Sequence, residues 1–376
     1  MTQDSGKDLA AAEPAAPPRA VLAERVPVRR VILLALSVLI VVGVGYASFR
    51  TLTLPAAEGR LDGATWRSLV VLGIAQGSIY ALIALGYSLV YGILLMINFA
   101  HGEVFMAGAF TSFFVAAPLE RSGFLDRNLV ASILLLMLVS MAASTLVAVL
   151  LERIAYRPLR NAPRLVPLIT AIGASLFLQN TFRGFFGPQT RGYPSFQQLE
   201  GTWTVLGVPV LRTQALVIVT AALAMVGLSL FVARTRTGRS MRAVAEDKEI
   251  AGLMGIDVDR IIVLTFAIGG MLAGIAGVLF ALVFGQVSAF MGFAPGIKAF
   301  TSAVLGGIGS IAGAAIGGLI LGLLESVAPF LLLKGAHVPS PNQLKDVIAF
   351  AILVLVLIFR PGGILGTGDP EKEGMT

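Results

Sequence analysis

The stretch IIVLTFAIGGMLAGIAGVLFALVFGQVSAFMGFAPGI, residues 261–297, carries no charged side chain and decides the fold class of this chain. A transmembrane α-helix needs about twenty consecutive apolar residues, so this run exceeds a single crossing and must contain a break. Pro295 and Gly296 disfavour a continuous helix, and we place the break near residues 291–296. Ser68–Gly102 is a second uncharged run that is too long for one helix, and its break is predicted near residues 96–102.

The overall composition agrees with a membrane protein. Of the 376 residues, 56% are hydrophobic and 13% are charged, and the mean hydropathy is +0.87, whereas an average soluble domain is about 25% charged. Cysteine is absent and histidine occurs only at positions 101 and 337, which excludes disulfides, thiolate sites and multi-histidine metal sites. We therefore expect no metal, no cofactor and no catalytic residue. The net charge of +7 is explained by basic loops that stay in the cytoplasm, so we expect no nucleic-acid partner.

The apolar runs predict an all-α polytopic membrane protein with about ten membrane segments, some of them short or broken. The predicted segments are residues 31–49, 68–94, 103–118, 128–152, 165–184, 213–233, 261–284, 295–309, 311–330 and 345–360. With the N-terminus inside, 17 of the 28 basic residues fall in cytoplasmic segments, which favours both termini on the cytoplasmic side.

The domain organisation follows from these segments. Residues 1–30 are rich in alanine and proline and poor in large apolar groups, so they are predicted to be a disordered cytoplasmic extension. Residues 31–366 form the transmembrane domain, with a cytoplasmic loop at 234–260, and residues 367–376 form a cytoplasmic tail. The basic residues before position 31 imitate a signal peptide, but the apolar run is long and lacks a clear cleavage site, which favours a first helix. Residues 193–209 are predicted to be a small external cap.

The two halves of the chain resemble each other. Phe99-Ala100-His101-Gly102 recurs as Phe293-Ala294-Pro295-Gly296, each after a long glycine-containing apolar run. Five predicted crossings precede Arg234 and five follow it, which is the layout of two inverted five-segment repeats. In such proteins broken helices at the repeat interface line the substrate path. We therefore predict that the translocation path includes Asn98, Phe99, His101, Gly102, Glu103, Phe293, Ala294, Pro295 and Gly296.

Asn98, His101 and Glu103 are the strongly polar side chains of the first break. Polar groups at membrane depth usually face the protein interior or a water-filled path. Glu103 could carry charge, accept a hydrogen bond from a ligand ammonium group, or cap the next helix. Two possible ligands cannot fill a metal coordination sphere, so a metal site is not expected here.

The loop at residues 234–260 carries the second motif. Val244, Ile250, Ala251 and Met254 recur at three- and four-residue steps, which predicts a short amphipathic helix over residues 243–256. Such a helix could lie on the membrane or insert into a groove on a partner, and its acidic residues favour the partner. The residues predicted to make this contact are Ala245, Glu246, Asp247, Ile250, Ala251, Met254 and Gly255.

These motifs resemble the membrane-spanning permease subunit of a branched-chain amino-acid ABC importer, the LivH type. The resemblance rests on GYSLVYG at residues 86–92, NFAHGE at 98–103, AEDKEIAGLMGI at 245–256 and GGIGSIAGAAIGG at 306–318, in that order. It covers about residues 66–366, and the extension at 1–30, with the first helix, departs from it.

The resemblance implies a set of partners in the bacterial inner membrane. They are a second homologous permease subunit, two cytoplasmic ATPase subunits and an extracytoplasmic solute-binding protein. The loop around Glu246–Gly255 matches the family's coupling helix, which docks on the ATPase. The sequence contains no phosphate-binding Gly-x-x-x-x-Gly-Lys-Ser/Thr motif, in agreement with ATP hydrolysis on separate subunits.

Several alternatives remain at this stage. Closely similar permeases carry urea or short amides, so leucine, isoleucine or valine is the first substrate expectation and urea the second. A stand-alone secondary transporter or channel fits the composition but has no need of a coupling loop. An intramembrane enzyme would need a catalytic dyad, for which His101 and Glu103 are the one candidate pair.

Overall fold

The structure, a computed structural model, describes residues 28–55, 60–160, 162–163, 165–205, 207–360 and 362–365. Within these residues, nine helices are long and apolar enough to cross a membrane. The main helices are α1 (Val28–Leu52), α2 (Gly63–Leu94), α3 (His101–Arg121), α5 (Leu129–Leu151), α6 (Leu165–Phe186), α7 (Arg212–Arg234), α10 (Val258–Phe284), α11 (Phe293–Gly306), α12 (Ile311–Leu333) and α13 (Lys345–Phe359). These ten helices match the ten predicted segments, and α11 is the short one. The predicted tail at 367–376 and residues 1–27 of the predicted extension lie outside the described residues.

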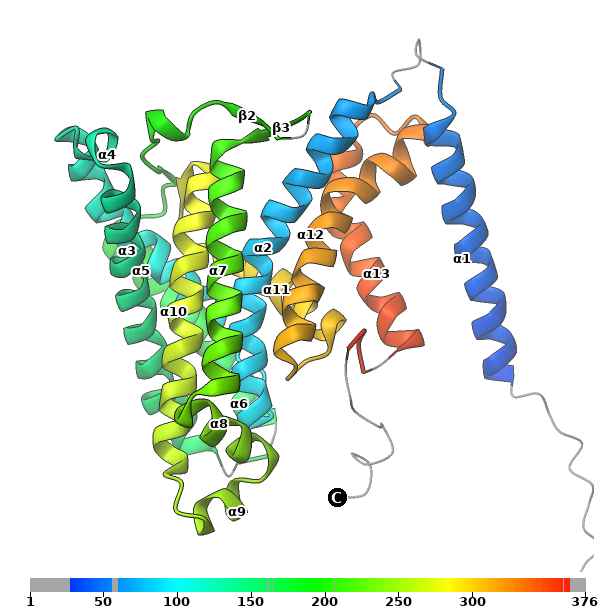
Figure 1. Cartoon of the computed structure of the whole chain (residues 1–376). Coiled ribbons are helices and arrows are strands. Elements are labelled where there is room, and N and C mark those ends of the chain that lie inside the picture. The colour runs from blue at the N-terminus through cyan, green and yellow to red at the C-terminus, as the bar shows by residue number, and fades with distance from the viewer. Residues whose placement is uncertain are drawn as a thin grey trace, which may run out of the picture.

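Shorter elements occupy the two ends of the helical bundle. They are α4 (Phe124–Arg127), the π-helical turn η2 (Glu152–Tyr156), the 3-10 turns η3 (Arg157–Leu159), η4 (Gln197–Leu199), η5 (Lys334–Ala336) and η6 (Pro341–Leu344), the helices α8 (Arg236–Glu246) and α9 (Lys248–Leu253), and the strands β1 (Arg191–Gly192), β2 (Thr202–Val205), β3 (Val208–Leu211) and β4 (Gln286–Val287). Antiparallel pairs join β1 to β4 and β2 to β3. The β2–β3 hairpin lies at the end of the bundle opposite α8 and α9 (Figure 1). The first part of the predicted cap packs on the bundle, where Tyr193 and Phe196 are buried.

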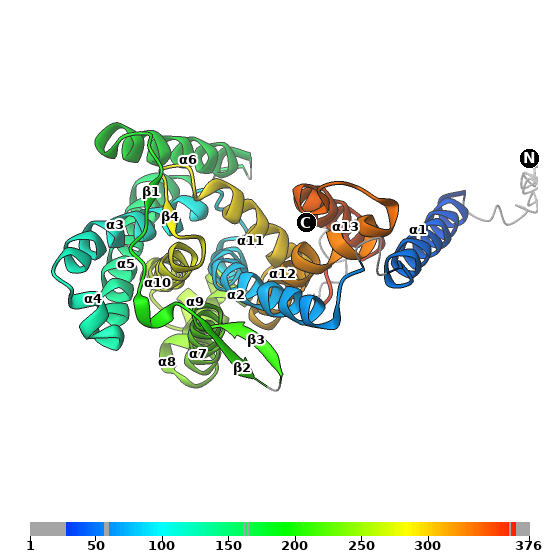
Figure 2. The same cartoon turned by 90° about the horizontal axis from the view of Figure 1, so that it is seen from above.

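Helices α2 and α10 form the centre of the bundle. Helix α2 packs against α12, α10, α11 and α7, and α10 packs against α5, α2 and α3. Seen from above, α1 lies at one edge, beyond α12 and α13, and α6 lies along another edge beside α3 and α11 (Figure 2). The start of α1 and the end of α13 point to the side that carries α8 and α9 (Figure 1).

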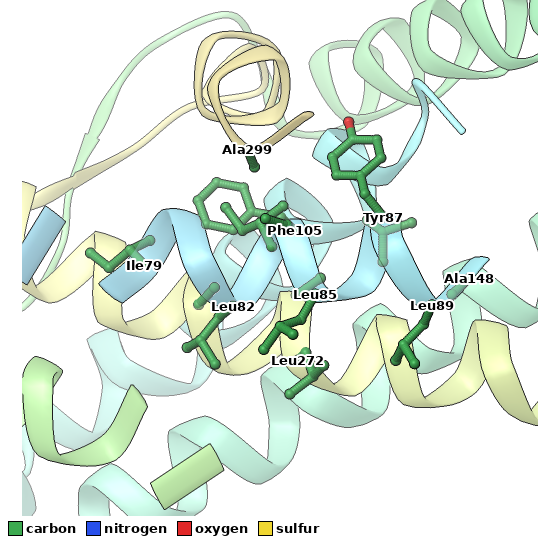
Figure 3. Close-up of a cluster of buried hydrophobic side chains, with 14 of the residues drawn as sticks. Ile79, Leu82, Leu85, Tyr87, Leu89, Phe105, Ala148, Leu272 and Ala299 are labelled. Carbon is green, nitrogen blue, oxygen red and sulfur yellow. The ribbon is translucent and has the colours of Figure 1, made fainter. Parts of the chain in front are cut away.

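Side chains on two opposite faces of α2 form the middle of the buried core. Leu82, Leu85 and Leu89 point toward α10, where Leu272 meets them, whereas Tyr87 points to the other side of α2 (Figure 3). All these side chains are buried. Helix α2 is apolar on every face, which is typical of a helix at the centre of a membrane bundle.

Close helix crossings in the bundle depend on glycine. A Cβ at Gly322 of α12 would overlap the backbone of Gly77 and Gly73 on α2, and a Cβ at Gly274 of α10 would lie 2.7 Å from the Ser140 carbonyl oxygen of α5. Gly313 and Gly317 meet the backbone of α11 in the same way. The small-xxx-small spacings Gly270–Gly274 and Gly313–Gly317 therefore bring helices into contact, as the sequence predicts.

The helix packing has the pairing that an inverted repeat requires. In this comparison the long helices α1, α2, α3, α5 and α6 correspond in order to α7, α10, α11, α12 and α13. The contact of α2 with α12 then corresponds to the contact of α10 with α5. The contact of α3 with α5 likewise corresponds to that of α11 with α12, and all four contacts are present. Helix α2 runs toward the α8–α9 end and α10 runs away from it (Figure 1), which is the inversion.

The positions of the helix breaks refine the sequence prediction. The first break, between Leu94 and His101, is where the sequence places it. The second lies at residues 285–292, so Pro295 and Gly296 belong to the first turn of α11 instead of the break. This is sterically permitted because the first helical turn makes little use of its N–H groups and tolerates proline.

One ion-pair network ties α11 into the bundle. The Nζ of Lys298 lies 2.9 Å from Oε1 of Glu325 on α12 and 2.7 Å from Oδ1 of Asp346 on α13. Tyr80 of α2 donates a hydrogen bond of 2.9 Å to Oε2 of Glu325. Lys298 and Glu325 are buried, so this basic residue inside a membrane segment is neutralised by neighbouring helices.

Candidate functional site

The two predicted breaks meet in space. A Cβ on Gly102 would lie 2.5 Å from the carbonyl oxygen of Gly292 and 3.1 Å from the Cα of Gly296. The α2–α3 junction and the start of α11 therefore touch through glycine backbone, although about 190 residues separate them in the chain. The repeated sequence predicted that both breaks border one path, and the structure places the two breaks in contact.

Beside this contact lies a cavity of about 580 Å³. Its walls come from the α2–α3 junction, from α6 and from the start of α11. The lining residues are Tyr87, Phe99, Ile172, Ser175, Leu176, Gln179, Phe290, Phe293, Ala294, Gly296 and Ile297. Phe293 is 59% exposed and Leu176 is 53% exposed, so the cavity opens at the edge of the bundle. It is a mainly apolar site with two polar side chains, the composition typical of a small-molecule pocket.

Four of the nine residues predicted for the path line this cavity: Phe99, Phe293, Ala294 and Gly296. The other five are behind its wall. Asn98 is buried and accepts a hydrogen bond of 2.7 Å from the Tyr156 hydroxyl. Gly102 and Pro295 are buried at the contact between the breaks.

His101 has a packing role that the sequence does not reveal. Its ring is buried 4.9 Å from the Tyr87 ring in an edge-to-face arrangement. A Cβ at Gly86 would overlap the imidazole, and a Cβ at Gly269 of α10 would lie 3.6 Å from its Cε1 atom. The histidine therefore fills a slot that two glycines leave open between α2 and α10, and it does not line the cavity. Glu103 hydrogen-bonds to α6, not to this ring, so the geometry joins no His101–Glu103 dyad.

Glu103 is the buried carboxylate behind the cavity wall. Its Oε1 accepts hydrogen bonds of 2.7 Å from Gln179 and 3.2 Å from Ser175, both on α6. Its Oε2 has no hydrogen-bond partner among the described residues and faces the backbone at Gly292. The side chain makes no capping bond to its own helix, for which no side-chain cap is present. The geometry therefore does not support the capping role considered from the sequence, and the carboxylate instead accepts hydrogen bonds from α6, which the sequence did not predict.

Ser175 and Gln179 are the site residues that sequence reasoning missed. They are polar and four residues apart, so they lie on one face of α6. Within a mostly apolar segment that spacing was the available signal. The spacing does not identify the partner of Ser175 and Gln179, because these side chains reach Glu103 only when α6 packs beside α3.

The predicted cytoplasmic helix over residues 243–256 is two helices. Asp247 adopts an extended conformation, ends α8, and caps α9 by accepting hydrogen bonds from the N–H groups of Glu249 and Ile250. Helix α8 buries Met241 and Val244 against the bundle. A single helical stripe through Val244, Ile250, Ala251 and Met254 was therefore wrong, because the chain changes direction at Asp247.

Helix α9 presents apolar side chains to the outside. Leu253 is 87% exposed and Met254 is 79% exposed, and Ile250 is also exposed, whereas Ala251 is buried. Ala245, Glu246 and Gly255 are exposed as well, and Gly255 has a φ of 83° that favours glycine. Helix α9 lies at the extreme end of the molecule (Figure 1). Exposed large apolar groups beside charged ones are typical of a protein–protein contact.

Ion pairs hold the neighbouring loop beside α8 and α9. Arg157 donates to Asp259 at 2.7 Å, and Arg160 bridges Asp259 and the buried Glu152. The end of α5 and the start of α10 are thereby joined at the end of the bundle that carries α9. Arg157 and Arg160 thus lie at the same end of the bundle as α8 (Figure 1).

Comparison with known proteins gives a consistent result. The profile of a family described as the permease component of the branched-chain amino acid transport system matches residues 69–357. The high-affinity branched-chain amino acid transport system permease protein BraD of Pseudomonas aeruginosa is 47% identical over 310 residues, which cover 81% of this chain and 96% of that protein. The corresponding protein LivH of Escherichia coli K12 is 44% identical over 309 residues, 80% of this chain and 95% of that protein. No solved structure matches this chain.

Proposed function

Because this chain belongs to the family of branched-chain amino acid transport permease components, we propose that it is the membrane-spanning permease subunit of an ATP-driven importer of leucine, isoleucine and valine. The observation that carries the proposal is the cavity between α6 and α11, which is walled by Phe, Ile and Leu and contains few polar groups. An aliphatic amino acid needs such surroundings for its side chain and a few polar partners for its charges. The cavity opens at the edge of the bundle, which suits a subunit that supplies half of a path.

The partners follow from the same proposal. A second, homologous permease subunit completes the path, an extracytoplasmic binding protein delivers the amino acid, and two ATPase subunits hydrolyse ATP. The α8–α9 end faces the cytoplasm of a bacterial cell, with both chain termini on that side, and the β2–β3 hairpin faces outward. The arginines of α8 and of the 152–160 loop support this orientation.

Deleting this subunit is expected to abolish uptake of labelled leucine by cells that carry the complete transport system, and re-expression should restore it. The reason is that half of the path is lost while the binding protein and ATPases remain. Labelled urea, measured in the same cells, tests the alternative substrate. Unchanged leucine uptake together with lost urea uptake would show that the substrate assignment is wrong.

Helix α9 is proposed to be the coupling helix that docks on an ATPase subunit, and Leu253 supplies its most exposed apolar contact. Leu253→Asp should lower leucine uptake at least about tenfold, because truncating a central apolar anchor costs on the order of 2 kcal/mol of binding. Leu253→Met keeps the apolar surface and is the matched control, expected near wild-type uptake. Normal leucine uptake and normal co-purification of the ATPase with Leu253→Asp would show that α9 is not the coupling helix.

A further inference from the structure

One face of α6 carries three polar side chains at successive helical turns. Ser175, Gln179 and Arg183 are spaced by four residues, so they lie in line, about 6 Å apart per step. Ser175 and Gln179 line the cavity. The Arg183 guanidinium lies 5.9 Å from the ring centroid of Phe290, another lining residue, and forms no ion pair within the described part of the chain. A cation is thereby placed at the rim of the cavity.

The carboxylate of Glu103 lies behind Ser175 and Gln179, on the side away from the cavity. Glu103 is about 1% exposed and is held through Oε1 by Gln179 and Ser175, while Oε2 is without a hydrogen-bond partner among the described residues. No basic side chain is paired with it in the part of the chain that the structure describes. Gln179 donates to Glu103 through Nε2, which leaves its carbonyl oxygen Oε1 as the acceptor for a ligand. The carboxylate polarises that amide, which favours a positive donor in the cavity.

We propose that this line of α6, backed by Glu103, is a subsite for the charged head of an α-amino acid. The ammonium group donates to Gln179 with Glu103 as its counter-charge, and the carboxylate is directed toward Arg183 one turn away. The aliphatic side chain then lies among Ile172, Phe293 and Ile297. The inference rests on the proposed function and adds a specific selection step inside the permease, separate from selection by the binding protein.

The chain has no cysteine, which permits a direct binding assay. Leu176→Cys places a thiol in the cavity wall, and labelling of this subunit by a small maleimide is followed in the purified transporter complex without added binding protein. Leucine is expected to slow the labelling. Two analogues probe the head groups: 4-methylpentanoate lacks the ammonium group and isoamylamine lacks the carboxylate. Both should protect more weakly than leucine.

Variants in the Leu176→Cys background assign each contact. Gln179→Leu and Glu103→Gln should raise the leucine concentration for half-protection at least about tenfold, since a hydrogen bond to a charged group contributes about 1.5–3 kcal/mol. They should also remove the preference for leucine over 4-methylpentanoate. Arg183→Leu should remove the preference for leucine over isoamylamine and leave the other preference intact. A general packing defect would not separate the two preferences in this way.

Asn180→Leu is the matched control. Asn180 is the amide next to Gln179, is exposed, and donates to the Leu176 carbonyl of its own helix, so its loss should leave protection unchanged. The inference would be overturned if Gln179→Leu and Asn180→Leu raised the leucine concentration for half-protection equally. It would also be overturned if leucine gave no protection in the Leu176→Cys background. If leucine uptake still depends on the subunit in the deletion experiment, such a result removes the subsite alone and leaves the proposed function in place.

Discussion

Replacing Lys298 by methionine is expected to lower the free energy of unfolding by about 3–5 kcal/mol. Lys298 is the cation that lies between Glu325 and Asp346, and methionine would leave the buried Glu325 carboxylate without a counter-charge. Four helices meet at this network, because Tyr80 of α2 also donates to Glu325. The measurement is the midpoint of unfolding in a detergent titration of the purified subunit or complex, followed by helical circular dichroism.

The control variants separate the lost charge pair from lost packing. Lys298→Met combined with Glu325→Gln and Asp346→Asn removes all three charges and should recover most of the stability, because no buried charge is left unpaired. Lys334→Met makes the same chemical change at a lysine that forms no ion pair among the described residues, and its midpoint should stay near that of the native chain. A Lys298→Met midpoint equal to that of Lys334→Met would show that the network contributes nothing to stability.

Gly322→Ala is expected to disrupt the packing of α12 against α2 and to cost about 3 kcal/mol of unfolding free energy. A Cβ at this position would overlap backbone atoms of Gly77 and Gly73. Backbone atoms cannot turn aside as a side chain could, so the two helices would have to separate and lose their close contact along the crossing. The expected result is a subunit that is largely lost from the membrane, or is purified with a much lower unfolding midpoint.

Gly227→Ala on α7 is the matched control for this change. No atom lies within 4 Å of a Cβ at Gly227, and alanine is the better helix former by about 1 kcal/mol. The Gly227 variant should therefore be as stable as the native chain or slightly more stable. Similar midpoints for the two variants would mean that the α2–α12 crossing tolerates the extra methyl group by a small shift of one helix.

The polar residues of the site show how far sequence reasoning reaches. The cost of burying Asn98, His101 and Glu103 in a membrane segment is local, so the sequence is enough to predict that they have partners. What each side chain contacts depends on other parts of the chain: Tyr156 for Asn98, Gly86 and Gly269 for His101, and α6 for Glu103. Four of the nine predicted path residues line the cavity, since position beside a break does not fix the direction of a side chain.

The loop at residues 234–260 is a second instance. The sequence predicted helical structure there, but the helical spacing was followed across Asp247, where α8 ends. Aspartate caps a helix N-terminus well, and the extended backbone at Asp247 turns α9 away from α8. As a result Ala251 is buried while Ile250, Leu253 and Met254 face outward.

The apolar runs were enough to predict a helical membrane protein of ten segments with two related halves, and they placed the first of the two helix breaks correctly. Those properties depend on the length and apolar character of continuous segments, because each helix must span the hydrocarbon layer and satisfy its own backbone groups there. Only the packed helices show that the α2–α3 junction touches Gly292 and Gly296 through Gly102, that α6 supplies Ser175 and Gln179, and that Lys298 is neutralised. These features depend on close approach between distant helices, and approach is set by which small residues face each other after packing.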